Sequence, residues 1–217
     1  MNYNTISSSS KGNCIIVEKS LMLDCGVSYK AIKPYLKDIK LIFISHIHKD
    51  HLSPTTIQQI AYNYPNIRFV CGSKEVVRKL YKNKVKPVNI FYLEERQWYT
   101  LRFVKLRIDK LEHDTPNHCL HFELGGKKGI YIVDTNNVDN IVAKNYDLYL
   151  IESNYNQDIL EKHILECEDE NELYYLNRVP KTHLSYEQAN SFLIENMKED
   201  SWFEYIHQSS YNFEERD

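Results

Sequence analysis

Short apolar runs alternate along the first half of the chain with segments whose apolar residues recur at helical spacing. Leu41–Ile44 is a continuous apolar run, which is typical of a strand buried on both faces. Ser53-Pro54 then provides a helix N-cap and a first-turn proline, and apolar residues follow at helical spacing. A second strand is expected at Arg68–Cys71 and a second helix at Ser73–Tyr81. This order predicts an α/β fold.

The remaining segments extend this pattern to both ends of the chain. Cys14–Glu18 and Leu21–Asp24 predict a hairpin, and the polar stretch Ser7–Asn13 before it predicts a loop. Ser185 begins a sequence with capping-box spacing, so a helix is expected after it. Further strands are expected at Leu101–Asp109, His118–Leu124, Ile130–Val133, Leu148–Glu152 and Trp202–Ile206, and a helix-favouring segment at Gln157–Leu176.

Composition and charge narrow the class of protein. The 217 residues carry a net charge of -3, whereas a protein that follows a long nucleic-acid backbone usually presents a basic groove. The charge therefore favours a small substrate or a local basic patch. The length suits one domain over residues 1–217, and no repeat or linker interrupts the pattern.

The cysteines and the apolar segments bear on cellular location. The five cysteines have no Cys-x-x-Cys spacing and do not suggest a disulfide framework. No stretch of about 18 apolar residues occurs, and the polar segment 1–12 lacks the apolar core of a secretion signal. We therefore expect reduced thiols, a cytoplasmic location and no membrane association.

Three of the nine histidines lie within six positions, together with an aspartate. On an extended segment His46 and His48 project to the same side, where both can bind one cation. Asp50 and His51 can face a second cation once the chain turns. Imidazole and carboxylate groups without thiolates favour two zinc ions, with manganese or iron as alternatives. The spacing therefore predicts a two-metal centre.

Other histidines have ordinary explanations. An isolated histidine is usually exposed or a satisfied polar residue. His118 and His121 lie in an expected strand, and His163 lies among helix-favouring charges. We leave these three out of the predicted ligand set.

The motif His-x-His-x-Asp-His at positions 46–51 resembles the signature of the metallo-β-lactamase superfamily. The resemblance covers nearly the whole chain and implies an αββα sandwich, with two mixed sheets flanked by helices. It implies that Asp24 orients the metal loop without binding metal. It also implies that His113 is the third imidazole of the first metal and that Asp134 bridges both metals.

The last ligand that the resemblance implies is a histidine at the end of a late strand. His183 and His207 compete for this role. We choose His207, because it follows an apolar strand, whereas His183 precedes a capped helix. In the ribonuclease Z-like branch a histidine placed like His183 lies beside the metals and protonates the leaving group. The resemblance therefore implies that His183 is a general acid.

Three further segments, Ser9–Cys14, Ile151–Asn154 and His183–Ser185, resemble the small bacterial exonuclease branch labelled YycJ or WalJ. The chain departs from that branch at Tyr155, where the branch tends to carry histidine. It also departs at His207-Gln208-Ser209, where the branch tends to carry His-Leu-Ser.

The resemblance implies a dinuclear metal-dependent phosphodiesterase that hydrolyses a nucleotide phosphodiester bond. Asp50 and Asp134 would orient the attacking hydroxide, and His183 would protonate the departing oxygen. The exonuclease branch favours a nucleic-acid end as substrate, whereas the acidic charge favours a small cyclic nucleotide.

Several alternatives stay open. One is a cyclic-nucleotide phosphodiesterase of the phage type, which disarms bacterial immune signalling. Another is a lactam or thioester hydrolase of the same fold, and a third is a non-catalytic nucleotide-binding protein. The family often dimerises, so a homodimer is an assembly that the resemblance implies.

Overall fold

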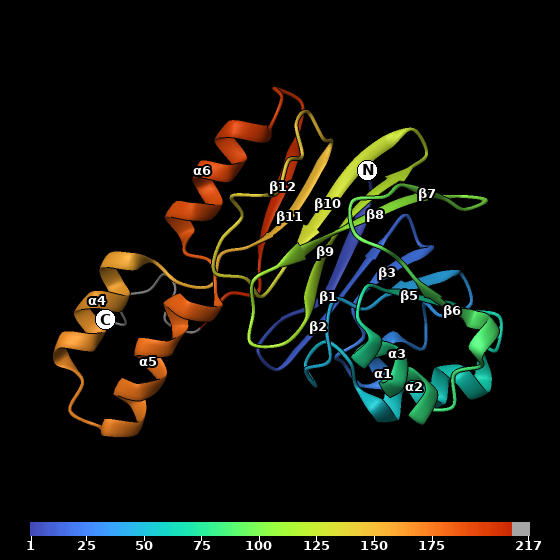
Figure 1. The fold of residues 1–217 in the computed structure, drawn as a ribbon, viewed down its shortest axis with the longest axis horizontal. Helices are drawn as coiled ribbons and strands as arrows, with labels where there is room; N and C mark the ends of the chain where they lie inside the picture. The colour runs from blue at the N-terminus through green and yellow to red at the C-terminus, as the bar shows by residue number, and fades with distance from the viewer. Residues whose placement is uncertain (210–217) are drawn as a thin grey trace.

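The computed structural model describes residues 1–209, in which two six-stranded sheets pack against each other (Figure 1). The first sheet contains β1 (Tyr3–Ser9), β2 (Gly12–Val17), β3 (Leu21–Leu23), β4 (Leu41–Phe43), β5 (Arg68–Cys71) and β6 (Ile90–Tyr92), in that order. The second contains β7 (Tyr99–Thr100), β8 (Lys105–Leu111), β9 (Asn117–Leu124), β10 (Lys127–Ile132), β11 (Leu148–Glu152) and β12 (Trp202–Ile206), ordered β12-β11-β10-β9-β8-β7.

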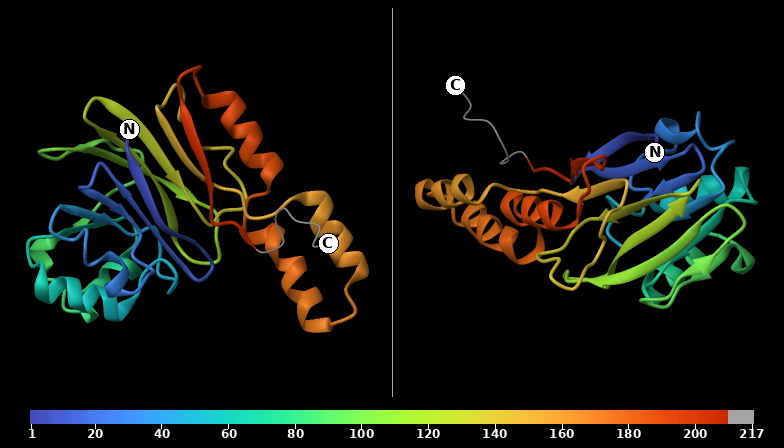
Figure 2. Two further views of the ribbon diagram at one scale, coloured as in Figure 1. Left: turned by 180° about the vertical axis from the view of Figure 1, so that it is seen from behind. Right: turned by 90° about the horizontal axis from the view of Figure 1, so that it is seen from above.

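Helices cover the outer faces of the two sheets. The helices are α1 (Tyr29–Ile32), α2 (Pro54–Asn63), α3 (Lys74–Lys82), the 3-10 helix η1 (Pro87–Asn89), α4 (Gln157–Glu166), α5 (Glu170–Thr182) and α6 (Tyr186–Asn196). Figures 1 and 2 show α1 to α3 against the first sheet and α6 against the second, while α4 and α5 form a hairpin that projects from one end. Both sheets contain parallel and antiparallel pairs, which confirms the predicted sandwich of two mixed sheets.

Three buried apolar clusters hold these layers together. Phe43 of β4 and Tyr131 of β10 meet edge to face between the sheets, with ring centroids 6.5 Å apart. Ile57 and Leu80 belong to the cluster between the first sheet and its helices. Phe192 of α6 packs against the outer face of the second sheet. The continuous apolar run at β4 is buried on both faces, as predicted, because a helical layer and a sheet cover it.

The strands expected at Leu101–Asp109 and Ile130–Val133 are shifted to Lys105–Leu111 and Lys127–Ile132, and two other segments differ from the sequence predictions in kind. Residues 7–9, expected in a loop, pair with β2 as part of the edge strand β1. Their side chains are only half-buried, so this part of the strand is held by main-chain pairing with β2. Such pairing requires no alternation of apolar and polar residues, so the sequence does not reveal it. The segment 157–176 contains parts of two helices, because Asn156 and Asp169 each cap a separate helix through their side chains.

The strand directions determine where a site can form. β3 and β4 are parallel, and so are β10, β11 and β12. The carboxyl ends of parallel strands meet at one edge of a sheet, where α/β proteins usually bind ligands. The loops that follow β4, β8, β10 and β12 carry the histidine and aspartate residues of interest. Among residues 1–209, no helix is long and apolar enough to cross a membrane.

Candidate metal centre

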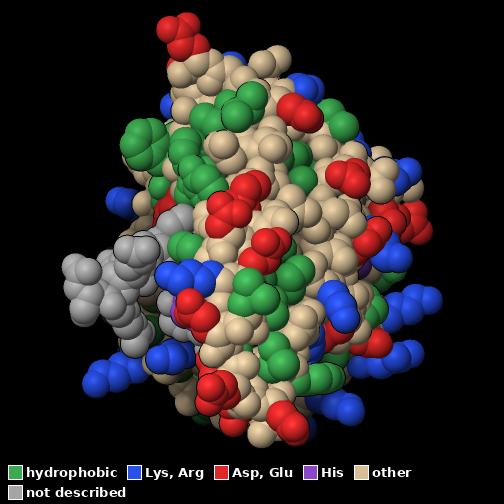
Figure 3. Space-filling model, turned by 90° about the vertical axis from the view of Figure 1, so that its left-hand side faces the viewer, with side chains coloured by type: hydrophobic (Ala, Val, Ile, Leu, Met, Phe, Trp, Pro, Cys, Tyr) green, Lys and Arg blue, Asp and Glu red, His purple; other side chains and the backbone are tan. Residues whose placement is uncertain are grey.

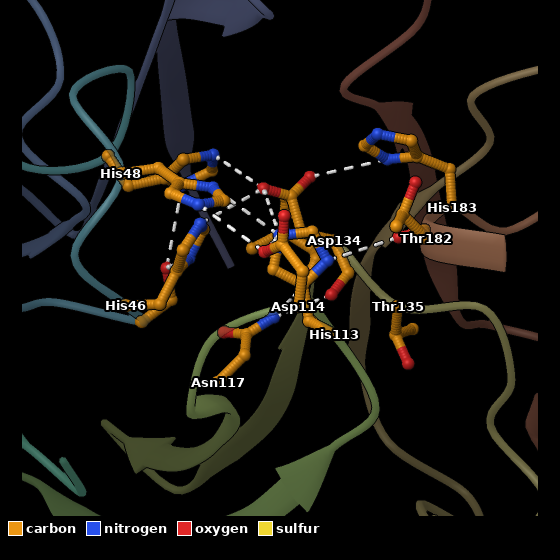
Figure 4. A network of polar contacts seen from close by, with 12 residues as sticks. His46, His48, His113, Asp114, Asn117, Asp134, Thr135, Thr182 and His183 are labelled. Carbon is orange, nitrogen blue, oxygen red and sulfur yellow. Dashed lines mark hydrogen bonds and ion pairs between the residues drawn. The ribbon is translucent and has the colours of Figure 1, made fainter. Parts of the chain in front are cut away.

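All seven predicted metal ligands lie together at the carboxyl ends of the strands. Figure 4 labels His46, His48, His113 and Asp134 among them. The loop after β4 provides the His-x-His-x-Asp-His motif, and the segments after β8, β10 and β12 provide His113, Asp134 and His207. One sheet therefore contributes the motif and the other sheet contributes its partners. The role of these residues as ligands stays a prediction, but their proximity is a property of the fold.

The backbone is left-handed at three positions around this site. Asp24, Asp134 and His207 have φ values of 58°, 51° and 53°. Each residue directly follows or nearly follows a strand, so the chain turns sharply and directs the side chain to the sheet edge. Such a conformation costs a residue other than glycine roughly 1–2 kcal/mol. Strain of this kind concentrates at functional sites.

The first ligand group contains His46, His48, His113 and Asp134, whose ligand atoms lie within 4.8 Å of one another. His46 Nε2 lies 3.3 Å from Asp134 Oδ2, and His113 Nε2 lies 3.4 Å from His48 Nδ1. The four side chains therefore point their ligand atoms into a common space. Three imidazoles and a carboxylate are a donor set that zinc accepts.

The second ligand group contains Asp50, His51, Asp134 and His207, again with ligand atoms within 4.8 Å of one another. His51 Nε2 lies 3.1 Å from Asp50 Oδ2 and 3.0 Å from Asp134 Oδ2. His207 Nε2 lies 3.0 Å from the other oxygen, Asp134 Oδ1. Asp134 belongs to both groups, so its carboxylate could be shared if each group holds a metal.

Asp24 anchors the metal loop from beneath. Its wholly buried carboxylate accepts hydrogen bonds from the backbone N–H and hydroxyl of Ser45, both at 2.8 Å, and from the Tyr131 hydroxyl at 2.8 Å. His51 Nδ1 lies 2.6 Å from Asp24 Oδ2. Burial opposes a charge on His51, but the Asp134 and Asp24 carboxylates dominate and raise the pKa of His51 well above its usual value. A metal at Nε2 would therefore displace one proton of His51, and Asp24 would hold the other proton on Nδ1. Asp24 thus contacts both the start of the metal loop and His51, and its orienting role stays a prediction.

Asn13, at the start of β2, supports the second group. Its Oδ1 lies 3.1 Å from His207 Nδ1, and its Nδ2 lies 3.0 Å from His51 Nε2. Its backbone N–H donates to the carbonyl of Asp50 at 2.7 Å. Because Asn13 Oδ1 holds the Nδ1 side of the His207 ring, the Nε2 side of the ring faces Asp134. Asn13 belongs to the segment Ser9–Cys14 that resembles the exonuclease branch, although no role in the site was predicted for it.

Glu152 fixes His183 at the side of the ligand groups. Glu152 ends β11 and is fully buried, and its Oε1 lies 2.6 Å from His183 Nδ1. His183 is the C-cap residue of α5, and its Nδ1 also lies 3.6 Å from Asp134 Oδ1. Burial opposes a charge on His183, but the Glu152 carboxylate dominates and raises the pKa of His183 to about 9. His183 is therefore protonated at neutral pH.

Burial and neighbouring charges set the protonation of the ligand groups. Burial lowers the pKa of His46, and it lowers the pKa of His113 to about 4. Both imidazoles are therefore neutral, the form that binds a metal. Burial opposes ionisation of Asp134, but His207 and His51 outweigh it and hold the pKa of Asp134 well below its usual value. Asp134 is therefore a carboxylate.

An independent observation supports a cation site at the first ligand group. His46 Nε2 is fully buried and forms no hydrogen bond with residues 1–209, although Asp134 Oδ2 lies 3.3 Å away. A buried polar atom without a partner is rare in folded proteins and calls for an explanation. A cation bound by the first ligand group would satisfy it.

A small pocket of about 220 Å³ opens over the ligand groups. Helix α5 forms one wall through Tyr175 and Arg178. Arg178 pairs with Asp114 Oδ2 at 2.6 Å, and Asp114 Oδ1 lies 3.3 Å from His48 Nε2. The projecting hairpin therefore supplies a cation to the mouth of the site. No sequence pattern marked Arg178, because its importance depends on the packing of α5.

His118 and His121 lie outside both ligand groups. His121 Nε2 lies 3.1 Å from Asp109 Oδ2 and 3.8 Å from Cys119 Sγ, so these three could also hold a metal. However, the Arg107 guanidinium already pairs with Asp109 at 2.9 Å. A buried ionic network explains this cluster without a metal. Both histidines therefore stay outside the predicted centre.

Comparison of sequences finds two kinds of relative, and no family model matches the chain. The chain is 26% identical over 172 residues to exodeoxyribonuclease WalJ of Streptococcus pneumoniae, covering 73% of this chain and 64% of that protein. It is 35% identical over 100 residues to the human inactive cytidine monophosphate-N-acetylneuraminic acid hydroxylase, covering 43% of this chain. That match spans only 20% of the hydroxylase, so the chain covers less than two thirds of either relative.

Solved structures resemble the chain over nearly its whole length. The metallo-β-lactamase fold protein YhfI from Bacillus subtilis superposes with a TM-score of 0.69 at 14% identity, covering 95% of this chain and 85% of YhfI. The short form of human tRNase Z gives a TM-score of 0.66 at 14% identity, covering 97% and 93%. Zinc-bound PqqB from Methylobacterium extorquens gives 0.65 at 10% identity, covering 98% and 90%. Together with its layers and strand order, these likenesses show that the chain has the metallo-β-lactamase fold.

Proposed function

We propose that the chain is a dinuclear metal-dependent phosphodiesterase that hydrolyses a phosphodiester bond of a nucleotide or a nucleic acid. The observation that carries this proposal is the pair of ligand groups joined by Asp134, with a protonated histidine at their side. The names of two relatives, an exodeoxyribonuclease and a tRNase, support the same class of reaction.

The donor set favours zinc in both groups, since it combines imidazoles with carboxylates and contains no thiolate. Two divalent cations about 3.5–4 Å apart supply activated water and neutralise charge in an in-line displacement. Asp134 would hold both ions, and Asp50 would orient the attacking water from the edge of the second group. Asp24 and Asn13 would keep the ligand imidazoles directed at the ions.

His183 would protonate the departing oxygen. Its Nδ1 is held by Glu152, so Nε2 is the nitrogen that can deliver a proton into the pocket. Its raised pKa keeps it protonated at neutral pH, as a general acid must be. An alkoxide leaving group, such as the ribose oxygen of a nucleotide, needs this proton far more than a p-nitrophenolate does.

Comparing two substrates tests this proposal. The metal-loaded protein should cleave both bis-p-nitrophenyl phosphate and a thymidine dinucleotide. His183→Asn keeps a donor for Glu152, and it should lower dinucleotide cleavage by about 10²–10⁴-fold, with a much smaller effect on the activated ester. His163→Asn, on the exposed side of α4, is the matched control and should change neither rate.

Metal content must be measured beside these rates. If the protein binds no divalent metal, or if the metal-loaded protein cleaves neither substrate, the proposed function is wrong. If His183→Asn lowers cleavage of both substrates equally while its metal content is intact, the role of His183 as the general acid is wrong.

A further inference from the structure

A larger cavity adjoins the pocket over the ligand groups. Its volume is about 870 Å³, compared with about 220 Å³ for the pocket itself. His113 and Thr182 line both, so the two are adjacent parts of one depression. Pockets of roughly 300–1,000 Å³ typically hold a small-molecule ligand, so the larger cavity has room for a nucleotide.

The walls of this cavity come from both sheets. Helix α3 begins in one wall, and the end of β8 and the loop after it form another. Gly72 makes the close approach possible, because a Cβ atom there would lie 2.3 Å from Ile108 Cδ1. The cavity is therefore built by the packing of the sandwich and does not depend on the conformation of an exposed loop.

Unpaired basic side chains predominate in the cavity. None of its four basic residues forms an ion pair with a residue in the described range 1–209; they are Lys74, Arg78, Lys110 and Lys181. One acidic residue, Asp114, is already paired with Arg178 at 2.6 Å. Glu95 Oε1 lies 3.3 Å from His118 Nε2, but burial lowers the pKa of His118, so this imidazole is neutral and Glu95 keeps its charge.

Three acidic residues of the cavity, Glu75, Glu95 and Glu112, have no charged partner within residues 1–209. The unpaired cations therefore outnumber the unpaired acids, although the whole chain has a net charge of -3. On the face on the side of α4 to α6, acidic, basic and apolar side chains are intermingled (Figure 3). Because Arg178 neutralises Asp114, the cavity carries a small excess of positive charge beside the ligand groups.

We propose that this cavity binds the nucleotide next to the scissile phosphodiester, with Lys74, Arg78 and Lys110 contacting its phosphate. The inference rests on the proposed function and names its substrate as the end of an oligonucleotide. A cyclic mononucleotide carries a single phosphate, which the ligand groups would hold, so it would leave these cations without a partner. An oligonucleotide satisfies both sites at once.

Charge-neutralising variants test the cavity. Lys74→Gln/Arg78→Gln removes two cations from its wall, whereas Lys82→Gln/Lys86→Gln removes two exposed cations from the end of α3 and the segment after it, outside the cavity. The measurements are kcat/KM for a short single-stranded thymidylate oligomer, for a cyclic mononucleotide and for bis-p-nitrophenyl phosphate, each at several salt concentrations.

The cavity variant should lower kcat/KM for the oligomer about tenfold and flatten its dependence on salt, because two phosphate contacts are lost. It should leave cleavage of bis-p-nitrophenyl phosphate unchanged, and the control variant should leave all three substrates unchanged. The wild-type protein should prefer the oligomer to the cyclic mononucleotide.

Any one of three results would overturn the inference. The first is that kcat/KM for the oligomer falls by the same factor in the cavity variant and in the control variant. The second is that the cavity variant loses bis-p-nitrophenyl phosphate cleavage by the same factor as oligomer cleavage. The third is a preference of the wild-type protein for the cyclic mononucleotide. In each case the wild-type protein still cleaves the small ester, so the proposed function stands. Failure of the metal-loaded wild-type protein on all three substrates would instead refute the proposed function, and this inference with it.

Discussion

Replacing Asp24 by asparagine isolates the effect of one buried carboxylate on the whole metal loop. The asparagine side chain would keep an oxygen in the place of Oδ1, which accepts the Ser45 backbone N–H at 2.8 Å. Its amide nitrogen would replace Oδ2, which faces His51 Nδ1 at 2.6 Å and the Tyr131 hydroxyl at 2.8 Å. Asparagine also tolerates the left-handed backbone at this position, where φ is 58°.

The Ser45 hydroxyl also lies 2.8 Å from Oδ2, but it could still donate to the retained oxygen, 3.0 Å away. The other two donors, His51 and Tyr131, would lose a charged acceptor inside the protein. A hydrogen bond to a charged group is worth about 1.5–3 kcal/mol, so the predicted loss in the free energy of unfolding is about 3–6 kcal/mol. His51 could avoid facing the new N–H group by moving its proton to Nε2, but Nε2 points at Asp134 and the predicted metal. The loss of this orienting partner should lower metal affinity about 10–100-fold.

Urea unfolding of the metal-free protein and competition with a chromophoric chelator measure the two effects. Tyr131→Phe is the control, because it removes one of the two donors and leaves the pair of Asp24 and His51 intact. It should cost about 1–3 kcal/mol and leave metal affinity nearly unchanged. If Asp24→Asn destabilises the protein no more than Tyr131→Phe, or binds metal as tightly as the wild type, then Asp24 does not orient the loop.

Three further predictions concern side chains around the ligand groups. Glu152→Gln removes the carboxylate that raises the pKa of His183. In a pH–rate profile, nucleotide cleavage by the wild type should fall as pH rises through about 9, and cleavage by the variant should begin to fall at a lower pH. Asn13→Ala removes the acceptor at Nδ1 of His207 and should weaken one of two bound metals about tenfold in a metal titration, leaving the other unchanged. Arg178→Gln should raise KM for an oligonucleotide about fivefold with little change in kcat in steady-state assays, because it leaves the Asp114 carboxylate at the mouth of the pocket without its cation, where it repels phosphate.

The strands and the ligand motif could be predicted because their signals are local. Arg68–Cys71, Leu148–Glu152 and Trp202–Ile206 were predicted with the bounds that the structure has, since each is a short apolar or aromatic run. The capping box at Ser185 is present, with both of its hydrogen bonds. The motif at positions 46–51 follows a buried strand, so its location at a sheet edge could be inferred from sequence alone.

The supporting residues of the site could not be predicted in this way. Asn13 contacts His207 across 194 positions of sequence, and Tyr131 contacts Asp24 across 107. A single sequence contains no record of which distant polar side chains meet. Arg178 gave no signal either, because a charged residue on an amphipathic helix is ordinarily solvated. The cationic cavity combines residues from α3, β8 and α5, and the slightly acidic composition conceals it.

The predicted ligands come from both sheets, and this determines whether metal binding requires the folded sandwich. His46, His48 and His51 follow a strand of the first sheet, whereas His113, Asp134 and His207 follow strands of the second. Neither ligand group is complete until the two sheets have packed, so metal binding must follow formation of the sandwich. The apolar clusters between and outside the sheets contain none of these ligands. In contrast to small zinc domains, whose folding energy comes from the metal, this chain should fold first and bind its metals afterwards.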